Sequence, residues 1–308
     1  MHESVLLSEI TEYLRPARAD GTLVDATVGL GGHSEALLER YPDVRLLAID
    51  RDPEALARSR ERLARFAPRV TFVLGRHESL IDIVKQSGLT SITGLLADLG
   101  VSSLQLDDPS RGFSFRSDGP LDMRMGPEDT SVADLVNMLD VEELARIIRE
   151  YGEEPSAWRI ANAIVEERAE ERIETTAQLA AIVRTVKHAR PHQIDPSTLT
   201  FQALRIAANR ELVDLDQFVS DAVALLEASA RVAIIAFHSL EDRIVKRAFR
   251  RLAGRCTCPP GLPVCGCGAV QYVEELTGRP VTASEEEVNR NPRSRSAKLR
   301  VAEKLPGH

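Results

Sequence analysis

The sequence lacks a long hydrophobic run and has few cysteines. No apolar stretch approaches the roughly 18 residues that a membrane-spanning helix needs, and Met1-His2-Glu3 does not open a secretion signal. We therefore expect a protein with no membrane partner and a cytoplasmic location. All four cysteines fall between Cys256 and Cys267, which excludes a disulfide scaffold and indicates one local feature.

The sequence also lacks an excess of positive charge, because 47 acidic residues outnumber 39 lysines and arginines and the net charge is −8. This excludes a protein that coats nucleic acid through its overall charge, but it leaves room for a local basic surface. With 308 residues, 43% hydrophobic and 28% charged, the chain has the composition of a globular protein that forms a large core, and we expect two domains.

One stretch near the N-terminus has the pattern of a nucleoside-binding site. Residues 22–27 predict a strand, residues 28–33 a glycine turn, and Ser34 the start of a helix. A second predicted strand, residues 45–49, leads into Asp50, roughly 20 residues after the turn. In an open α/β sheet, such a turn lets the backbone approach a ligand closely, and the acid can bind both ribose hydroxyls.

The glycine pattern favours one class of nucleoside over another. A dinucleotide fingerprint, G-x-G-x-x-G, would continue from Gly29 and Gly31 to a third glycine where this chain has Ser34. A pyrophosphate ligand is therefore disfavoured, and S-adenosylmethionine, a nucleoside without phosphate, is the better prediction.

The pattern of alternating strands and helices continues to residue 98. Asp52-Pro53-Glu54 predicts an N-cap and first turn, with a helix that continues to Phe66. Residues 70–74 and 92–97 predict two further strands, the second ending at Asp98. This order predicts a parallel, doubly wound sheet.

The order of elements changes after this point. Residues 107–130 predict a long loop, and helical periodicities follow without strands, including one after Asp140 and one that places Trp158 on an apolar face. A strand pattern returns at residues 231–237. We therefore expect an inserted helical domain, with an α/β domain at residues 1–106, the insertion at 107–204, and the remainder of the α/β domain at 205–308.

Several blocks along the chain carry a family resemblance. They are Gly29-Leu30-Gly31-Gly32-His33-Ser34, Ala48-Ile49-Asp50-Arg51-Asp52-Pro53, Asp98-Leu99-Gly100-Val101-Ser102-Ser103, Arg111-Gly112-Phe113-Ser114-Phe115, Phe201-Gln202-Ala203-Leu204-Arg205 and Phe237-His238-Ser239-Leu240-Glu241-Asp242-Arg243. With these blocks the chain closely resembles the bacterial 16S rRNA (cytosine-N4)-methyltransferases that act on a decoding-centre cytidine. One departure is Glu3-Ser4, which replaces the family's usual apolar-proline pair beside an expected N-terminal strand.

The resemblance implies a class I, Rossmann-like α/β methyltransferase fold with an inserted all-helical domain. It also implies S-adenosylmethionine as cofactor, the small ribosomal subunit and its 16S rRNA as partner, and transfer of a methyl group to cytidine N4. The oligomeric state is not readable from the sequence.

The expected cofactor contacts come from four strand ends or the loops after them. Gly31 and Gly32 are expected to present backbone amides to the amino-acid end of the cofactor, with His33 beside them; the ordinary alternative is a plain turn whose histidine caps the helix. Asp50 is expected to bind the ribose diol. The resemblance adds two contacts, His77 near the adenine and Gln105, which the sequence alone would interpret as surface-loop residues.

Asp98 is the predicted catalytic residue. The exocyclic amine of cytosine is a poor nucleophile because its lone pair is delocalised into the ring, so methyl transfer needs hydrogen-bond acceptors and alignment. Asp98 is a candidate acceptor, and an alternative role is to bind the ammonium group of the cofactor. Phe237 and Phe113 are candidates to stack on the base, and Phe237-His238-Ser239 is expected to face it. The alternative is that Ser239 caps a helix and Phe237 is buried.

Two further features concern RNA and metal. Basic residues gather in a helix and in the C-terminal tail, which makes a phosphate-binding surface plausible; they are Arg243, Lys246, Arg247, Arg250, Arg251, Arg255, Arg290, Arg293, Arg295, Lys298 and Arg300. Four thiolates can close a structural zinc site. The candidate ligands are Cys256, Cys258, Cys265 and Cys267, and the alternatives are free thiols or a chance pair of C-x-C sequences.

Two other functions remain open from the sequence. One is a nicotinamide-dependent oxidoreductase on the same fold, which Ser34 and the basic segments disfavour. The other is a zinc-stabilised RNA-binding protein without enzymatic activity, against which the intact Gly31, Gly32, Asp50 and Asp98 argue.

Overall fold

The structure is a computed structural model that describes residues 4–188, 195–256, 258, 266 and 268–307. It contains two compact units, one formed by residues 1–100 and 214–308 and the other by residues 101–213. The boundary expected between residues 204 and 205 falls inside helix α10 (Thr198–Asn209), because the whole of this helix packs on its neighbour α7 (Val141–Gly152) within the helical unit. No helix in the described part of the chain is long and apolar enough to cross a membrane.

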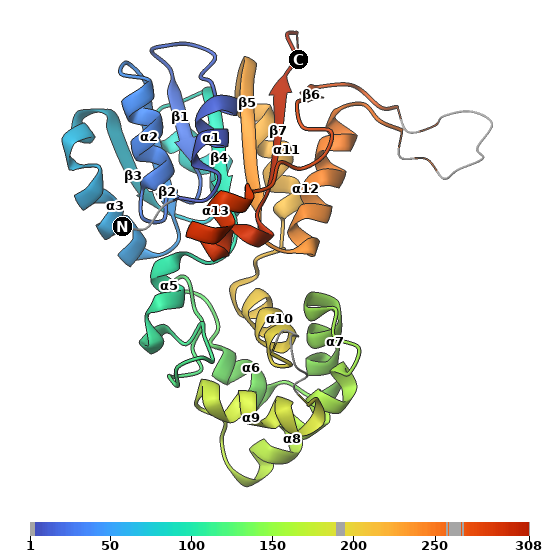
Figure 1. Cartoon of the computed structure of the whole chain (residues 1–308). Helices are drawn as coiled ribbons and strands as arrows, with labels where there is room; N and C mark the ends of the chain where they lie inside the picture. The colour runs from blue at the N-terminus through green and yellow to red at the C-terminus, as the bar shows by residue number, and fades with distance from the viewer. Residues whose placement is uncertain (1–3, 189–194, 257, 259–265, 267, 308) are drawn as a thin grey trace. The chain divides into compact units, whose positions relative to one another are not determined.

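The first unit is built on a seven-stranded sheet with the order β3-β2-β1-β4-β5-β7-β6 (Figure 1). The strands are β1 (Thr22–Asp25), β2 (Arg45–Asp50), β3 (Val70–Leu74), β4 (Ile92–Asp98), β5 (Leu226–Ala236), β6 (Val273–Glu275) and β7 (Lys298–Lys304). The first five pair in parallel, and β7 runs antiparallel to both β5 and β6. The strand order reverses between β1 and β4, so the topological switch point of the sheet lies there.

Helices cover both faces of this sheet. One apolar core joins α1 (Leu7–Tyr13), α2 (Gly32–Arg40) and α3 (Pro53–Arg62) to alternate residues of the strands, including Leu23, Leu46, Ala48, Leu96 and Leu299. Because side chains alternate along a strand, the intervening residues face the other side. The remaining helices of the unit are α4 (Leu80–Gln86), α11 (Leu215–Leu225), which packs on both α4 and α12 (Ser239–Leu252), and α13 (Glu285–Arg290).

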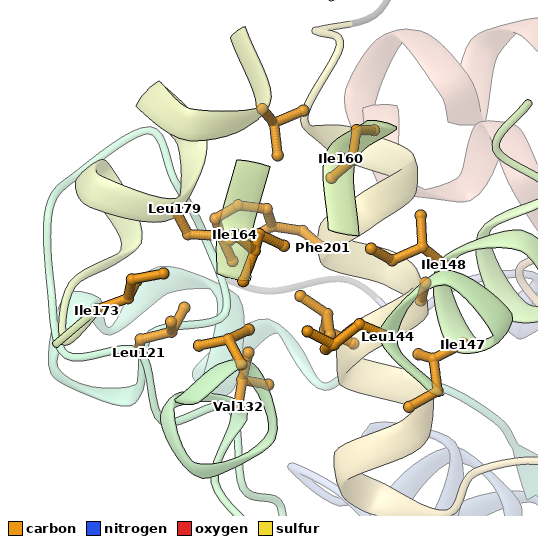
Figure 2. Close-up of a cluster of buried hydrophobic side chains, with 14 of the residues drawn as sticks. Leu121, Val132, Leu144, Ile147, Ile148, Ile160, Ile164, Ile173, Leu179 and Phe201 are labelled. Carbon is orange, nitrogen blue, oxygen red and sulfur yellow. The ribbon is translucent and has the colours of Figure 1, made fainter. Parts of the chain in front are cut away.

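The second unit contains helices and loops but no strand among its described residues. Its helices are α5 (Ser103–Asp107), α6 (Val132–Met138), α7, α8 (Ala157–Glu170), α9 (Thr176–Val186) and α10. Figure 2 shows the apolar core that they share, in which Leu144, Ile160, Ile164, Leu179 and Phe201 converge. This core is separate from that of the sheet, which explains why the unit is compact by itself.

The structure confirms the α/β class with an inserted helical region, and it corrects several details. The apolar runs expected as the first four strands are strands. The N-terminal strand expected around Val5-Leu6-Leu7 is instead a turn that leads into helix α1, which begins at Leu7. The face expected to bury Trp158 leaves that side chain 52% exposed. The C-terminal strands β6 and β7 were not foreseen.

Candidate active site

Three aspartates lie at the carboxyl ends of adjacent strands, where ligands bind in open α/β sheets. Asp25 ends β1, Asp50 ends β2 and Asp98 ends β4. The backbone N–H of Asp98 donates to the Thr27 hydroxyl at 2.6 Å, which joins the two strand ends across the switch point. The structure therefore brings Asp50 and Asp98, both expected from the sequence, to one edge together with Asp25.

The Asp50 carboxylate organises the glycine turn. One oxygen accepts from the N–H of Gly29 at 2.8 Å and the other from the N–H of Asp52 at 2.9 Å. Burial raises the pKa of Asp50 to about 6. A third backbone N–H, that of Arg51, also favours the charged form. The group is thus mainly ionised at pH 7 and can accept from a further donor. Helix capping falls to Asp52, as expected, since its side chain accepts from the N–H of Glu54.

The turn after β1 delivers the start of helix α2 to the same edge. Gly31 precedes the helix with φ +76°, a left-handed conformation that side chains rarely adopt. No side chain caps α2, so its first amides point toward a position suited to an anion. The space that a Cβ on Gly32 would need is taken by the Ser4 hydroxyl, so the N-terminal segment packs closely on this glycine.

A buried pair beneath this turn was missed by the sequence analysis. The Ser34 hydroxyl donates to Asp25 at 2.6 Å, and the N–H of Thr27 donates to the other Asp25 oxygen at 3.2 Å. Asp25 is only 2% exposed, and burial raises its pKa to about 6. Ser34, which replaces the third glycine of a dinucleotide fingerprint, thus has a definite structural partner.

Asp98 is the least satisfied acid of the edge. Its Oδ1 is buried and has no hydrogen-bond partner among the described residues, while the side chain as a whole is 28% exposed. Its Oδ2 lies 3.8 Å from Nδ1 of His33, whose Nε2 donates to the Val5 carbonyl at 2.8 Å. Burial and the nearby carboxylates of Asp25 and Glu241 raise the pKa of Asp98 to about 8.

His77 follows strand β3, in a short 3-10 helix, η2 (His77–Ser79). Its ring packs edge-on against Phe218 with centroids 5.1 Å apart, and its Nε2 is buried without a hydrogen-bond partner in the described structure. Burial lowers its pKa to about 4, so the ring is neutral at pH 7. It is therefore a partly buried histidine with an unused polar atom.

The segment after β5 also ends at this edge. His238, rather than Ser239, is the N-cap of α12, and it forms a capping box with Glu241. The Glu241 carboxylate accepts the N–H of Phe237 at 2.9 Å and lies 3.3 Å from His238 Nε2. Phe237 is half-buried. The alternative with a Ser239 cap is wrong, because the imidazole and the glutamate already satisfy the first amides.

Two expected contacts belong to the helical unit. Gln105 lies on α5, is 4% exposed and completes a capping box with Ser102. Phe113 is 7% exposed and is part of the helical core. This ring, a candidate to stack on the base, is therefore already packed against apolar side chains.

Comparison with known proteins identifies the family. The family model described as "MraW methylase family" matches residues 1–305. The chain belongs to the MraW methylase family. A "Ribosomal RNA small subunit methyltransferase H" of Trichlorobacter lovleyi is 52% identical to it, over 99% of this chain and 98% of that one, and the protein of the same name from Thermomicrobium roseum is 51% identical, over 99% and 94%. Among solved structures, an rRNA methylase from Streptococcus thermophilus is similar with 14% identity and a TM-score of 0.40, over 99% of both chains.

Membership of the MraW methylase family makes this chain a methyltransferase and decides against the nicotinamide-dependent alternative. A class I methyltransferase sheet agrees with the strand order and with the antiparallel β7. The roles of individual residues at the edge are a separate matter and remain predictions.

Seven of the eleven expected basic residues divide into two groups, and a phosphate contact by Arg290, Arg293, Arg295 and Lys298 stays a prediction. Arg243, Lys246, Arg247 and Arg250 lie three and four residues apart on α12 and are all exposed, so they form one stripe, which we call the basic stripe. The other cations of this set form ion pairs within the chain. Arg251 pairs with Asp216 at 2.8 Å, Arg255 with Glu275 at 2.9 Å, and the buried Arg300 with Asp242 at 2.7 Å. Arg300 is therefore not part of an RNA-facing tail.

The zinc prediction is only partly covered by the structure. Cys256 is exposed and Cys258 half-buried. Cys265 and Cys267 lie outside the described residues. The four-thiolate site accordingly remains a prediction.

Proposed function

We propose that this methyltransferase transfers the methyl group of S-adenosylmethionine to the exocyclic N4 of a cytidine in the decoding centre, the P-site region, of 16S rRNA. The observation that carries the proposal is the pair of relatives named ribosomal RNA small subunit methyltransferase, which are about half identical over nearly the whole chain. The choice of N4 and of the decoding centre rests on the family resemblance of the sequence blocks. The small ribosomal subunit is the proposed partner.

The residues at the carboxyl edge fit the cofactor. Asp50 is the proposed acceptor for the ribose hydroxyls, and its pKa of about 6 keeps it ionised at pH 7. The uncapped amides after Gly31 suit the carboxylate of the amino-acid end, with Gly32 and His33 beside them. The neutral His77 offers its unused Nε2 to the edge of the adenine. Gln105 is retained as a cofactor contact on the resemblance alone.

Asp98 is the proposed acceptor for the reacting amine. When bound, S-adenosylmethionine supplies a methyl group on a positively charged sulfur. An ionised Asp98 accepts a hydrogen bond from N4, which concentrates electron density on that nitrogen, and it holds the amine in line with the methyl group. Phe237 and His238, at the neighbouring strand end, are the proposed contacts to the base.

The proposed RNA contact is electrostatic. The basic stripe on α12 is exposed, and Lys246, Arg247 and Arg250 make no ion pair with any residue in the described part of the chain. In a protein of net charge −8, such a local surface is needed to neutralise phosphates. The structural zinc site stays part of the proposal as a stabiliser of the cysteine-rich segment.

Mapping the methyl group tests the function. Small-subunit rRNA from cells with and without this protein would be digested and the modified nucleoside located. We expect N4-methylation of one decoding-centre cytidine to depend on the protein. Tritiated methyl transfer to purified small-subunit particles and to naked 16S rRNA then defines the substrate. Absence of transfer to either, with intact RNA binding, would indicate the non-enzymatic alternative.

A further inference from the structure

The inference concerns the carboxyl cluster at the switch point, formed by Asp25, Asp98 and Glu241. These groups come from β1, β4 and the start of α12, and both neighbours act electrostatically on Asp98. Asp25 is 2% exposed and Glu241 1% exposed. Two of the three acids are thus almost completely shielded from water, which weakens the screening of their repulsion with Asp98.

No lysine or arginine within the described residues pairs with Asp98, and its buried Oδ1 has no hydrogen-bond partner there. The other group facing it is His33. The His33 Nε2 donates to the Val5 carbonyl, which can only accept, so in the neutral ring Nδ1 carries no hydrogen and faces Asp98 as an acceptor. This surrounding suits a protonated Asp98.

We propose that Asp98 holds a proton in the ligand-free protein and releases it to solvent when the positively charged cofactor binds, with Asp25 and Glu241 as the positioning residues that enforce this exchange. The inference rests on the proposed cofactor and deepens its site. Binding itself then converts Asp98 from a hydrogen-bond donor into the acceptor that the amine requires.

The direction of the titration agrees. Asp98 has a pKa of about 8 without ligand, so it is mainly protonated at pH 7. Asp25 and Asp50 have pKa values of about 6. They are therefore mainly ionised at pH 7 and have few protons of their own to release. A cation beside Asp98 favours its charged form and lowers its pKa. Below pH 8 protons therefore compete with the cofactor, and its affinity falls about tenfold for each pH unit.

The exchange also closes the proton balance of the reaction. Methylation of N4 forms a nitrogen–carbon bond, breaks the sulfur–carbon bond and removes one proton from nitrogen, while the sulfur loses its positive charge. Asp98 takes that proton. The cluster then again contains a protonated Asp98 beside an uncharged thioether, which is the charge state that the ligand-free protein prefers.

Calorimetry in two buffers of different ionisation enthalpy measures the proton directly. S-adenosylmethionine is titrated into the full-length protein at pH 7, and the dependence of the heat on the buffer gives the number of protons released. We expect about one proton per ligand at pH 7 and nearly none at pH 9. The amino group of the ligand contributes equally in every variant and cancels in the comparison.

A second ligand locates the charge that is sensed. S-adenosylhomocysteine has the ammonium group but no sulfonium. Release with S-adenosylmethionine alone supports the proposal with the sulfonium as the cation beside Asp98, and release with both supports it with the ammonium. Binding of both ligands without any buffer dependence overturns the inference and leaves the proposed function intact. Failure of either ligand to bind would instead remove the proposed cofactor.

Three variants and one control separate charge from structure. Asp98→Asn should abolish the release. Asp25→Asn and Glu241→Gln keep an acceptor for Thr27 and Phe237 but remove one repelling charge, so each should shift the pH midpoint of release downward. Asp82→Asn, the same change on the exposed side of α4, should leave the midpoint unchanged; an equal shift there would contradict the inference.

Discussion

Two buried polar sites, one in each unit of this protein, differ in how well their hydrogen bonds are satisfied. In the helical unit, the buried Asn209 receives the N–H of Met125 at 2.8 Å and donates to the carbonyls of Met123 at 2.8 Å and Arg205 at 2.9 Å. At the carboxyl edge of the sheet, Asp98 Oδ1 and His77 Nε2 are buried without partners. Unsatisfied buried groups cost stability, so the edge sacrifices stability where a ligand would supply the missing interactions.

The largest expected effect comes from Asp98→Asn, which replaces the charged acceptor for the amine by a neutral amide that cannot take up its proton. We expect the turnover of methyl transfer to fall by about 10²–10⁴-fold, measured with tritiated S-adenosylmethionine on small-subunit particles. The ligand-free variant should also be more stable than the wild type above pH 8. The folded-state pKa of about 8 is raised from 3.8, so the wild type loses stability as pH rises through 8. Full turnover in this variant would contradict the role.

In the helical unit, the expected effect is on stability alone. Ile160 is fully buried in the core of Figure 2, and Ile160→Ala should lower the free energy of unfolding by about 2–5 kcal/mol. Urea unfolding followed by hydrogen exchange in α7 and α8 measures this. Met138→Ala, at a side chain that is 77% exposed, is the control and should change it by less than about 0.5 kcal/mol. Comparable losses in the two variants would mean that the core is not packed as described.

A smaller effect is expected for Asp50→Asn, which removes the charged acceptor for the ribose. The affinity for S-adenosylhomocysteine should fall about 10- to 100-fold, as measured by calorimetry at pH 8. In the wild type, affinity should also decline as pH falls through 6, because protonation removes the same charge. Asp52→Asn retains the helix cap and should bind normally. Equal losses in both variants would indicate damage to the turn rather than a lost contact.

The smallest effects concern the basic stripe. Lys246→Gln and Arg250→Gln should each reduce the slope of log affinity against log salt by about one for binding to 16S rRNA. Arg251→Gln should change it less, because that guanidinium already pairs with Asp216. Filter binding between low and moderate salt measures the slopes, and a slope that all three variants leave unchanged would exclude the stripe as the phosphate-binding surface.

The first half of the sheet was predictable because its strands are short apolar runs in the sequence. Residues 70–74 and 92–97 are almost continuous apolar runs bounded by turns, and they form β3 and β4. Strand β7 was missed because Lys298, Arg300 and Glu303 interrupt its apolar residues and resemble a solvated tail. In the structure Arg300 is buried and neutralised by Asp242, a pairing between distant segments that no local pattern contains.

The candidate site was predictable only in part, for a similar reason. Asp50 and Asp98 follow their strands and could be identified from position. Asp25 also ends a strand, but its importance depends on Ser34 and on the neighbouring Asp98, which the sheet brings together. The capping role of His238 depends on Glu241, one turn later in α12. In contrast to the Asp25 contacts, this pair has the spacing of a capping box and was visible in the sequence.

A crystal structure with S-adenosylhomocysteine bound tests the central claim most directly. We predict that the ribose hydroxyls lie within hydrogen-bond distance of Asp50 and that the sulfur lies beside Asp98, at the carboxyl ends of β1, β2 and β4. A ligand bound away from this edge, or an Asp98 carboxyl group turned into the apolar core beneath it, would contradict the assignment of the site.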